Sequence, residues 1–145
     1  MAAVPSRLWS EISPDLRAIL TAESLTIAQR PIEQAGRFQW ATIASMKVGF
    51  AVEAEPTGGG YQYISRQVRI RRGITIDASL NEDEVQDLCI DAQDTLIGAF
   101  LYDGNQPEGV SNIWLVEAED PLEDESNEWI VSIIFRVEYA VDVPQ

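Results

Sequence analysis

The sequence predicts an α+β fold: an antiparallel or mixed β-sheet of four to five strands, two helices packed on it, and a long β-hairpin arm. Two observations lead to this prediction. The chain has 145 residues, of which 46% are hydrophobic and 23% charged, which is the size and balance of one folded unit. Along it, two segments of helical periodicity alternate with runs rich in β-branched and aromatic residues. We therefore expect residues 1–145 to form a single domain.

The first helix is expected over Pro14–Glu23, where a preceding Ser13 suits the N-cap position and Pro14 the first helical position. A further turn of helix could precede it. Its apolar residues recur near a helical period, at Leu8, Ile12, Leu16, Ile19 and Leu20. The next segment, Leu25–Ile32, is expected to be extended, and its Pro31 favours an edge position or a strand end.

Two β-rich runs, Phe38–Glu55 and Tyr61–Ala78, flank the glycine-rich segment Thr57–Gly60 and predict the long hairpin. The glycine cluster lacks the Lys and Ser or Thr of a phosphate-binding loop, so we interpret it as a turn. In the second run, the alternation of apolar and basic residues slips by one position at Arg72 and Gly73. That slip predicts a β-bulge there.

The second helix is expected to begin at Asn81, because a Glu three residues later, Glu84, completes a capping box. Its predicted buried stripe follows the i, i+3, i+4, i+7 rule through Val85, Leu88, Cys89, Ala92, Leu96, Ala99 and Phe100. The single cysteine, Cys89, is therefore interpreted as a small core residue.

A turn-rich loop over Asp103–Gly109 precedes a predicted strand over Val110–Ala118, and an acidic loop over Glu117–Glu128 leads into the last strand. The last strand begins near Trp129 and places its apolar residues on one face, at Val131, Ile133, Phe135, Val137, Tyr139 and Val141. We expect Phe135 and Val137 to lie under the helix residues Leu88, Ala92 and Leu96.

The charge balance limits the function. With 24 acidic and 10 basic residues the formal net charge is −14, so the surface repels phosphate and tight DNA binding is not expected. The chain has no histidine, which removes the usual base of a hydrolase triad. We expect no enzyme activity, no cofactor and no metal. Charged residues in the first 20 positions argue against a signal peptide, and no apolar run is long enough to span a membrane.

Two charged groups are candidate contact sites. Four of the ten basic residues lie on one predicted strand, at Arg66, Arg69, Arg71 and Arg72. They are either solvated surface residues or a contact with an acidic face of a second copy or another protein. An acidic row lies opposite the apolar stripe of the second helix, at Asp83, Asp87, Asp91 and Asp94. This row, or the loop Glu117–Glu128, is either solvated surface or an acidic surface that faces a lumen or a partner.

In its size, its acidity, its order of helix, hairpin, helix and hairpin, and its terminal strand WIVSIIFRVEYAVD, the chain resembles the tail terminator (tail completion) proteins of long-tailed bacteriophages. More loosely, it resembles the neck and connector proteins beside them. The resemblance covers nearly the whole chain and has no diagnostic short motif.

The resemblance implies a virion protein, made in the host cytoplasm, that forms a hexameric ring. Such a ring caps the tail tube, contacts the neck or connector protein, and lets DNA pass through an acidic lumen without tight binding. A head-tail connector or stopper protein is the alternative within this class. A non-viral acidic protein-binding module is the alternative outside it.

Overall fold

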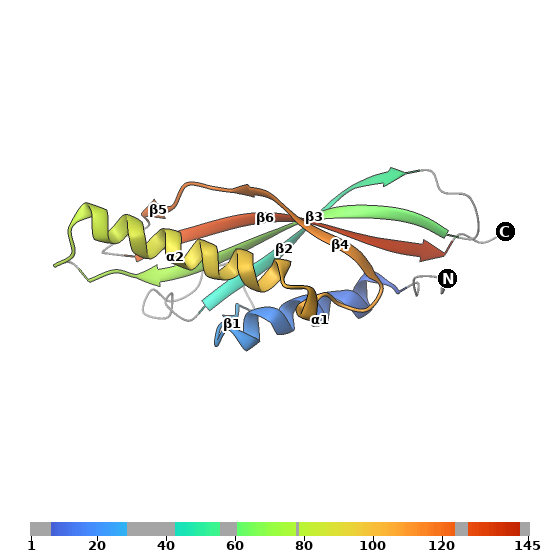
Figure 1. Ribbon diagram of the computed structural model, residues 1–145, viewed down its shortest axis with the longest axis horizontal. Helices are drawn as coiled ribbons and strands as arrows, with labels where there is room; N and C mark the ends of the chain where they lie inside the picture. Colours follow the sequence, from blue (N-terminus) through green and yellow to red (C-terminus); the bar gives the residue numbers. More distant parts are fainter. Residues whose placement is uncertain (1–6, 29–42, 56–60, 78, 124–127, 143–145) are drawn as a thin grey trace.

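The computed structural model describes residues 7–28, 43–55, 61–77, 79–123 and 128–142. Two helices lie on one face of a mixed β-sheet (Figure 1). The helical segments are α1 (Trp9–Ala22), α2 (Glu82–Leu101) and a short 3-10 turn, η3 (Asp103–Asn105). The strands are β1 (Thr26–Ile27), β2 (Ile43–Glu55), β3 (Tyr61–Thr75), β4 (Val110–Ala118), β5 (Leu122–Glu123) and β6 (Glu128–Asp142). The predicted α+β fold with two helices on the sheet is confirmed.

The sheet has six described strands in the order β1-β2-β3-β6-β4, with β5 paired to β6, where four or five were expected. Two of the six contain only two residues each: β1, which lies at the sheet edge within the extended segment predicted over Leu25–Ile32, and β5, which leaves little signal in the sequence. β1 runs parallel to β2, and every other pair is antiparallel. The longest strands, β3 and β6, pair with each other from Tyr61 to Thr75 in the interior of the sheet.

The two strands of the expected hairpin, β2 and β3, pair antiparallel from Ala44 to Glu55. The hairpin itself stays a prediction, because its turn lies outside the described residues. Pro31 and Phe38, the predicted start of the first β-rich run, also lie outside the described residues. The bulge predicted at Arg72 and Gly73 is wrong, since β3 and β6 stay in register through both residues. The irregularity lies in β2, where the register with β3 shifts between Val48 and Val52.

The first helix begins at Trp9 and runs through Pro14, so the prediction that it starts at Pro14 is wrong. The Glu11 carboxylate accepts a hydrogen bond from the Leu8 backbone N–H at 3.0 Å, which satisfies one donor at the start of the helix. Pro14 is the sixth residue of the helix, so it lacks the N–H that would donate to the Ser10 carbonyl, and its ring crowds that carbonyl. The sequence signal at Ser13 and Pro14 is therefore real but marks the second turn of the helix.

The second helix begins as predicted. The Asn81 side chain accepts a hydrogen bond from the Glu84 N–H at 2.9 Å, and the Glu84 carboxylate accepts one from the Asn81 N–H at 3.4 Å. The buried stripe of α2 differs from the predicted stripe at Leu88 and Gln93. Leu88 is 43% exposed, whereas Gln93 is buried and donates a hydrogen bond to the Glu119 carbonyl at 2.7 Å. The hydrogen bond satisfies the amide of Gln93, a buried polar residue that was not expected in the stripe.

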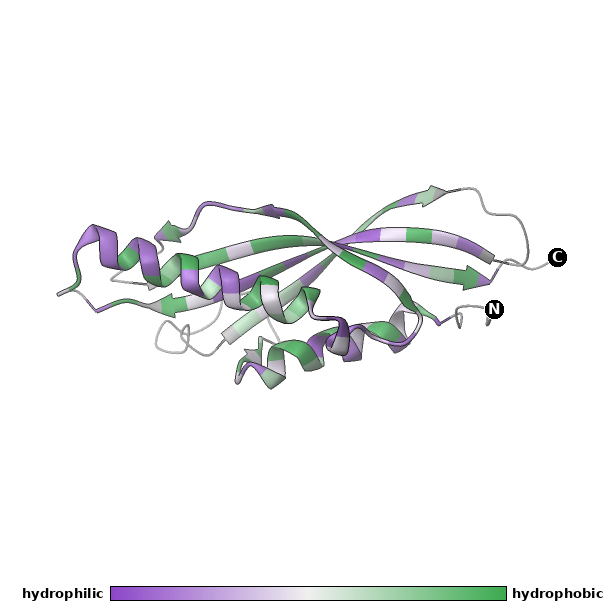
Figure 2. Cartoon of the chain, viewed as in Figure 1, coloured by the Kyte–Doolittle hydropathy of each residue, from purple (hydrophilic) through white to green (hydrophobic). Residues whose placement is uncertain are grey.

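The core lies between the two helices and one face of the sheet. Phe135 is fully buried and its ring stacks on that of Phe100, with centroids 4.8 Å apart. Leu96 and Val137 belong to the same cluster, which confirms their predicted burial, whereas the exposed Leu88 does not cover them. Ala92 and Cys89 pack instead with Val131 in a second, smaller cluster. Figure 2 shows hydrophilic and apolar residues alternating along the turns of α2.

Candidate functional site

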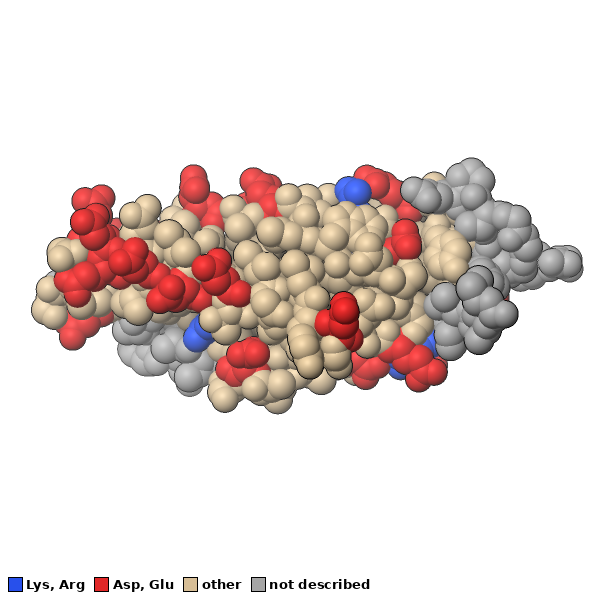
Figure 3. Space-filling view, in the orientation of Figure 1, with Lys and Arg blue, Asp and Glu red and all other residues tan. Residues whose placement is uncertain are grey.

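The acidic row predicted on the second helix lies on the surface of the molecule. All its members are exposed, together with Glu82, and α2 contains no basic residue. We define the acidic face as Glu82, Asp83, Asp87, Asp91 and Asp94. Within the described part of the chain, none of these carboxylates is in an ion pair with Lys or Arg. In Figure 3 they form the largest acidic surface of the view, over the N-terminal half of α2.

The second acidic candidate, Glu117–Glu128, is only partly a loop. Glu117 lies within β4, and Leu122 and Glu123 form β5, which pairs with β6. Glu117, Asp120 and Glu123 are exposed, whereas Glu119 is half-buried and pairs with Arg69 at 3.0 Å. Residues 124–127 lie outside the described residues. The structure therefore offers two acidic surfaces, one on α2 and one along β4 and β5, and they adjoin where Asp83, Asp120 and Glu123 line one hollow.

The arginine cluster is not one patch. Successive residues of a strand point to opposite faces, and Val68 and Ile70 of β3 are buried in the core beneath the helices. Arg66 and Arg72 share that helix-covered face, whereas Arg69 and Arg71 lie on the other face. The pattern of four arginines in seven residues showed a basic strand, but the strand divides them between the two faces of the sheet.

We call the face away from the helices the far face. On it, two ion pairs cross between strands: Arg69 with Glu119 at 3.0 Å and Arg136 with Glu53 at 3.1 Å. The Arg136 guanidinium also lies over the Trp114 ring, 5.8 Å from its centroid. Arg71 has a partner as well. The far face is therefore a polar surface on which much of the basic charge is already matched.

Arg72 lies half-buried on the helix-covered face, opposite Ala44 of β2 and Val131 of β6. Its buried Nε has no hydrogen-bond partner among the described residues. Burial lowers the pKa of Arg72 because it removes water from the guanidinium, while the charge of Glu23 acts in the opposite direction. A side chain in this environment is poorly placed to meet another protein.

Arg66 holds an irregular segment of β2. Its Nε donates to the Tyr139 hydroxyl at 2.8 Å, and its Nη1 donates to the Phe50 carbonyl at 3.1 Å. The Tyr139 ring packs in turn against Trp9 of α1, with centroids 5.4 Å apart. Phe50 itself is 97% exposed. Sequence reasoning did not single out Phe50, because a phenylalanine in a β-rich run is normally read as core.

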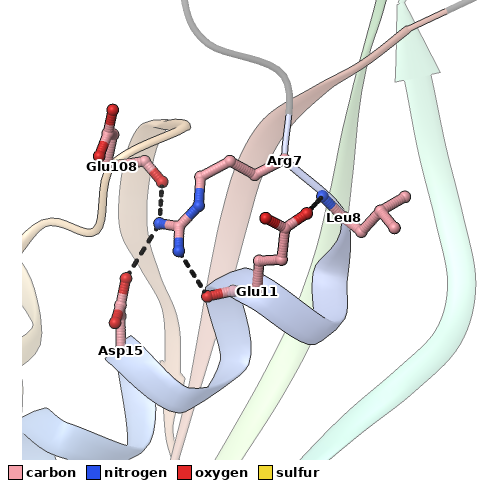
Figure 4. Close-up of polar contacts among 5 residues, drawn as sticks. All are labelled: Arg7, Leu8, Glu11, Asp15 and Glu108. Carbon is pink, nitrogen blue, oxygen red and sulfur yellow. Dashed lines mark hydrogen bonds and ion pairs between the residues drawn. The ribbon is translucent and has the colours of Figure 1, made fainter.

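A second residue that sequence reasoning did not single out is Arg7, which ties α1 to the segment before β4 (Figure 4). Its guanidinium donates to Asp15 at 2.9 Å and to the backbone carbonyls of Glu108 at 2.6 Å and Glu11 at 2.7 Å. Gly109 lies against its aliphatic stem and has a φ of +89°. These contacts join α1 to the segment before β4.

A hollow of about 610 Å³ lies beside the start of α2. Cys89, Val85 and Trp129 form its apolar wall, and Asp83, Asp120 and Glu123 line its acidic side. Burial raises the pKa of the Cys89 thiol, which keeps it protonated and unreactive. The hollow thus holds neither an activated nucleophile nor a histidine base.

No protein-family model matches the chain, and no curated protein matches it in sequence. Among solved structures, it is similar to a chain of the "Virion of native gene transfer agent (GTA) particle", with a TM-score of 0.49 and 17% sequence identity. The similarity covers 97% of this chain and 99% of that chain. None of the described helices is both long enough and apolar enough to cross a membrane.

Proposed function

We infer that this chain is a structural protein of a phage-like virion, and specifically a tail terminator. In this proposal it forms a hexameric ring that caps the tail tube, contacts the neck or connector protein, and conducts DNA without binding it tightly. It acts without enzyme activity or a cofactor. The observation that carries the proposal is the acidic face of α2, whose carboxylates are exposed and not in ion pairs with basic residues of the described chain.

An unpaired acidic surface suits a DNA conduit because DNA must slide past it. Phosphate contacts with Lys and Arg supply most non-specific DNA affinity, so a lumen wall of carboxylates supplies almost none. The helix α2 carries Glu82, Asp83, Glu84, Asp87, Asp91 and Asp94 and no basic residue. We propose that the acidic face lines the lumen, with the exposed carboxylates of β4 and β5 as the competing candidate.

The arginines of the far face, which already have partners within the chain, are assigned to contacts between proteins as well. Arg69 and Arg71 are proposed as a contact with a neighbouring subunit or a partner, because they lie on the far face and α2 does not cover them. Arg66 is assigned to holding the irregular segment of β2, and Arg72 lies half-buried on the helix-covered face, so neither belongs to that contact. This division follows from the two faces of β3.

The proposal is tested by charge reversal. Asp83, Asp87, Asp91 and Asp94 are replaced by Lys in one variant, and Glu117, Asp120 and Glu123 in another. A control variant carries Lys at Asp103 and Glu108, which are exposed outside both candidate surfaces. Assembly is followed by negative-stain imaging of rings and of virions, and duplex DNA binding is measured at several salt concentrations.

We expect no duplex binding by the wild-type protein at physiological salt, and salt-sensitive retention of DNA by rings of the α2 variant. The control variant should assemble and pass DNA as the wild type does. Sub-micromolar binding of duplex DNA by the wild-type protein would overturn the conduit. A protein absent from virions, or present at the neck without contact to the tube, would instead favour an acidic binding module or a connector or stopper, respectively.

A further inference from the structure

Both edges of the sheet expose apolar side chains. On β2, Phe50 is 97% and Val52 45% exposed, and on β4, Leu115 is 38% and Val116 41% exposed. Beyond Ala44, no described strand pairs with the outer side of β2, and none pairs with the outer side of β4. An open strand edge with exposed apolar residues is a ready site for pairing with another strand.

The exposure of Phe50 is built into the fold. Between Val48 and Val52, four residues of β2 span the length of two residues of β3, from Val68 to Arg66. The Arg66 guanidinium fills this irregularity and donates to the Phe50 carbonyl at 3.1 Å and the Gly49 carbonyl at 3.4 Å. A bulge of this kind re-aims side chains. A charged anchor to the buried Tyr139 therefore holds an aromatic side chain in solvent.

The directions of the two edges are complementary. β2 is antiparallel to β3, β3 to β6, and β6 to β4, so β2 and β4 run in opposite directions. A second copy in a similar orientation thus presents its β4 antiparallel to β2 of the first. Such a contact joins two different surfaces, and repeating it generates a closed ring or a filament.

Charge favours the same arrangement. Lys47 of β2 is exposed, stands directly across from Arg69, and makes no ion pair with another described residue. Like charges placed opposite each other in a sheet repel. On β4, Glu117 is exposed and lies on the far face, opposite Ile134. Lys47 on one edge and Glu117 on the other therefore carry opposite charges on the same face of the sheet, whereas Glu53 of β2 is already paired with Arg136.

We propose that the β2 edge of one copy docks on the β4 edge of the next, with Phe50 as the aromatic anchor that packs against Leu115 and Val116. Its role as the subunit contact of a ring rests on the proposed function. The contact itself rests on the exposed residues, the strand directions and the charges. Arg66 is a positioning residue in this arrangement, since it acts through the backbone of Phe50.

The first test is Phe50→Ala, with Tyr102→Ala as a matched control. Tyr102 is an aromatic residue that is 64% exposed and belongs to neither edge strand. Sedimentation velocity over a range of concentrations should show self-association of the wild type and of Tyr102→Ala. Association of Phe50→Ala should weaken at least tenfold, with an unchanged circular dichroism spectrum. Equal association of Phe50→Ala and the wild type would overturn the proposal.

The second test is disulfide cross-linking in a Cys89→Ala background. An Ala51→Cys protein, which keeps Phe50, and a Val116→Cys protein are oxidised separately and as a mixture; Ala51 is exposed on β2. The proposal predicts cross-linked dimers in the mixture only, because the contact joins two different edges. Dimers of Ala51→Cys alone would indicate a two-fold contact and overturn the proposal, as would a mixture with no cross-link.

These outcomes separate the contact from the proposed function. Rings on virions formed equally well by Phe50→Ala would overturn the contact and leave the tail terminator proposal standing. A wild-type protein that never enters virions but loses self-association with Phe50→Ala would overturn the tail terminator proposal and leave the contact standing.

Discussion

At the scale of single residues, the core position of Phe135 makes the firmest prediction. Its ring is fully buried and stacked on Phe100. Phe135→Ala should lower the free energy of unfolding by about 3–5 kcal/mol, because it removes buried apolar area and leaves a cavity. Phe50→Ala is the control and should change it by less than about 0.5 kcal/mol. Urea unfolding followed by circular dichroism measures both, and a loss under about 1 kcal/mol at Phe135 would contradict the core assignment.

Arg72 gives a prediction of opposite sign. Its Nε is buried without a hydrogen-bond partner among the described residues, and its neighbours on the adjacent strands are Ala44 and Val131. Arg72→Met keeps the length of the side chain and removes the poorly solvated charge, so it should raise the free energy of unfolding by up to about 1 kcal/mol. Arg69→Met should lower it by about 0–1 kcal/mol, since it breaks a surface ion pair. A destabilised Arg72→Met protein in thermal unfolding would refute this account.

Cys89 predicts a dependence on pH. Burial raises the pKa of its thiol in the folded protein, while in the unfolded chain it stays near its ordinary value of about 8.5. Above that pH the unfolded state loses a proton that the folded state keeps. The stability that the thiol contributes is therefore complete below about pH 8.5 and is lost as the pH rises toward the raised folded pKa. Cys89→Ala should lose less stability than the wild type between pH 7.5 and 9.5, measured by urea unfolding at about these pH values.

At the scale of elements, the attachment of α1 depends on Gly109. Its φ of +89° is strained for any residue with a side chain, and an added Cβ would lie 2.8 Å from the Arg7 Cδ. Gly109→Ala should therefore destabilise the protein by about 1–3 kcal/mol. Gly98→Ala is the matched control, because a Cβ there meets no atom within 4 Å. In the helix α2 it should stabilise by about 0.5–1 kcal/mol, and equal melting temperatures for the two variants would contradict both assignments.

The elements also show where sequence reasoning succeeds. The helix α2 and the strand β4 follow their predicted ranges closely, because each is bounded by local signals: the Asn81 and Glu84 cap, and the turn-rich loop before Val110. The start of α1 was misplaced because the Ser13 and Pro14 pair satisfies the rules for a helix start as well as those for its second turn. The bulge was misplaced because Arg72, a half-buried arginine, lies on the apolar face of β3. It interrupts the alternation of apolar and basic residues without any change in the strand register.

At the scale of the whole molecule, the net charge of −14 predicts a response to salt. The carboxylates of α2 repel one another, and the described ion pairs of Arg7, Arg69 and Arg136 offset only part of the acidic charge. Raising NaCl from about 0.05 to 0.5 M shortens the screening length to a few ångströms and should raise the melting temperature. The double variant Asp87→Asn and Asp91→Asn should show a smaller rise. A melting temperature that falls with salt would mean that ion pairs outweigh the repulsion.

The sequence by itself determined the fold class, the two helices, the exposure of the acidic row and the burial of Phe135, because each follows from local periodicity and caps. The tertiary structure decided which residues act together. It separated Arg66 and Arg72 from Arg69 and Arg71, since the face of a strand is set by its register with its neighbours. It also joined Arg66 to Tyr139 and Phe50, and Arg7 to Glu108. Such contacts join residues far apart in the chain, so local sequence patterns do not predict them.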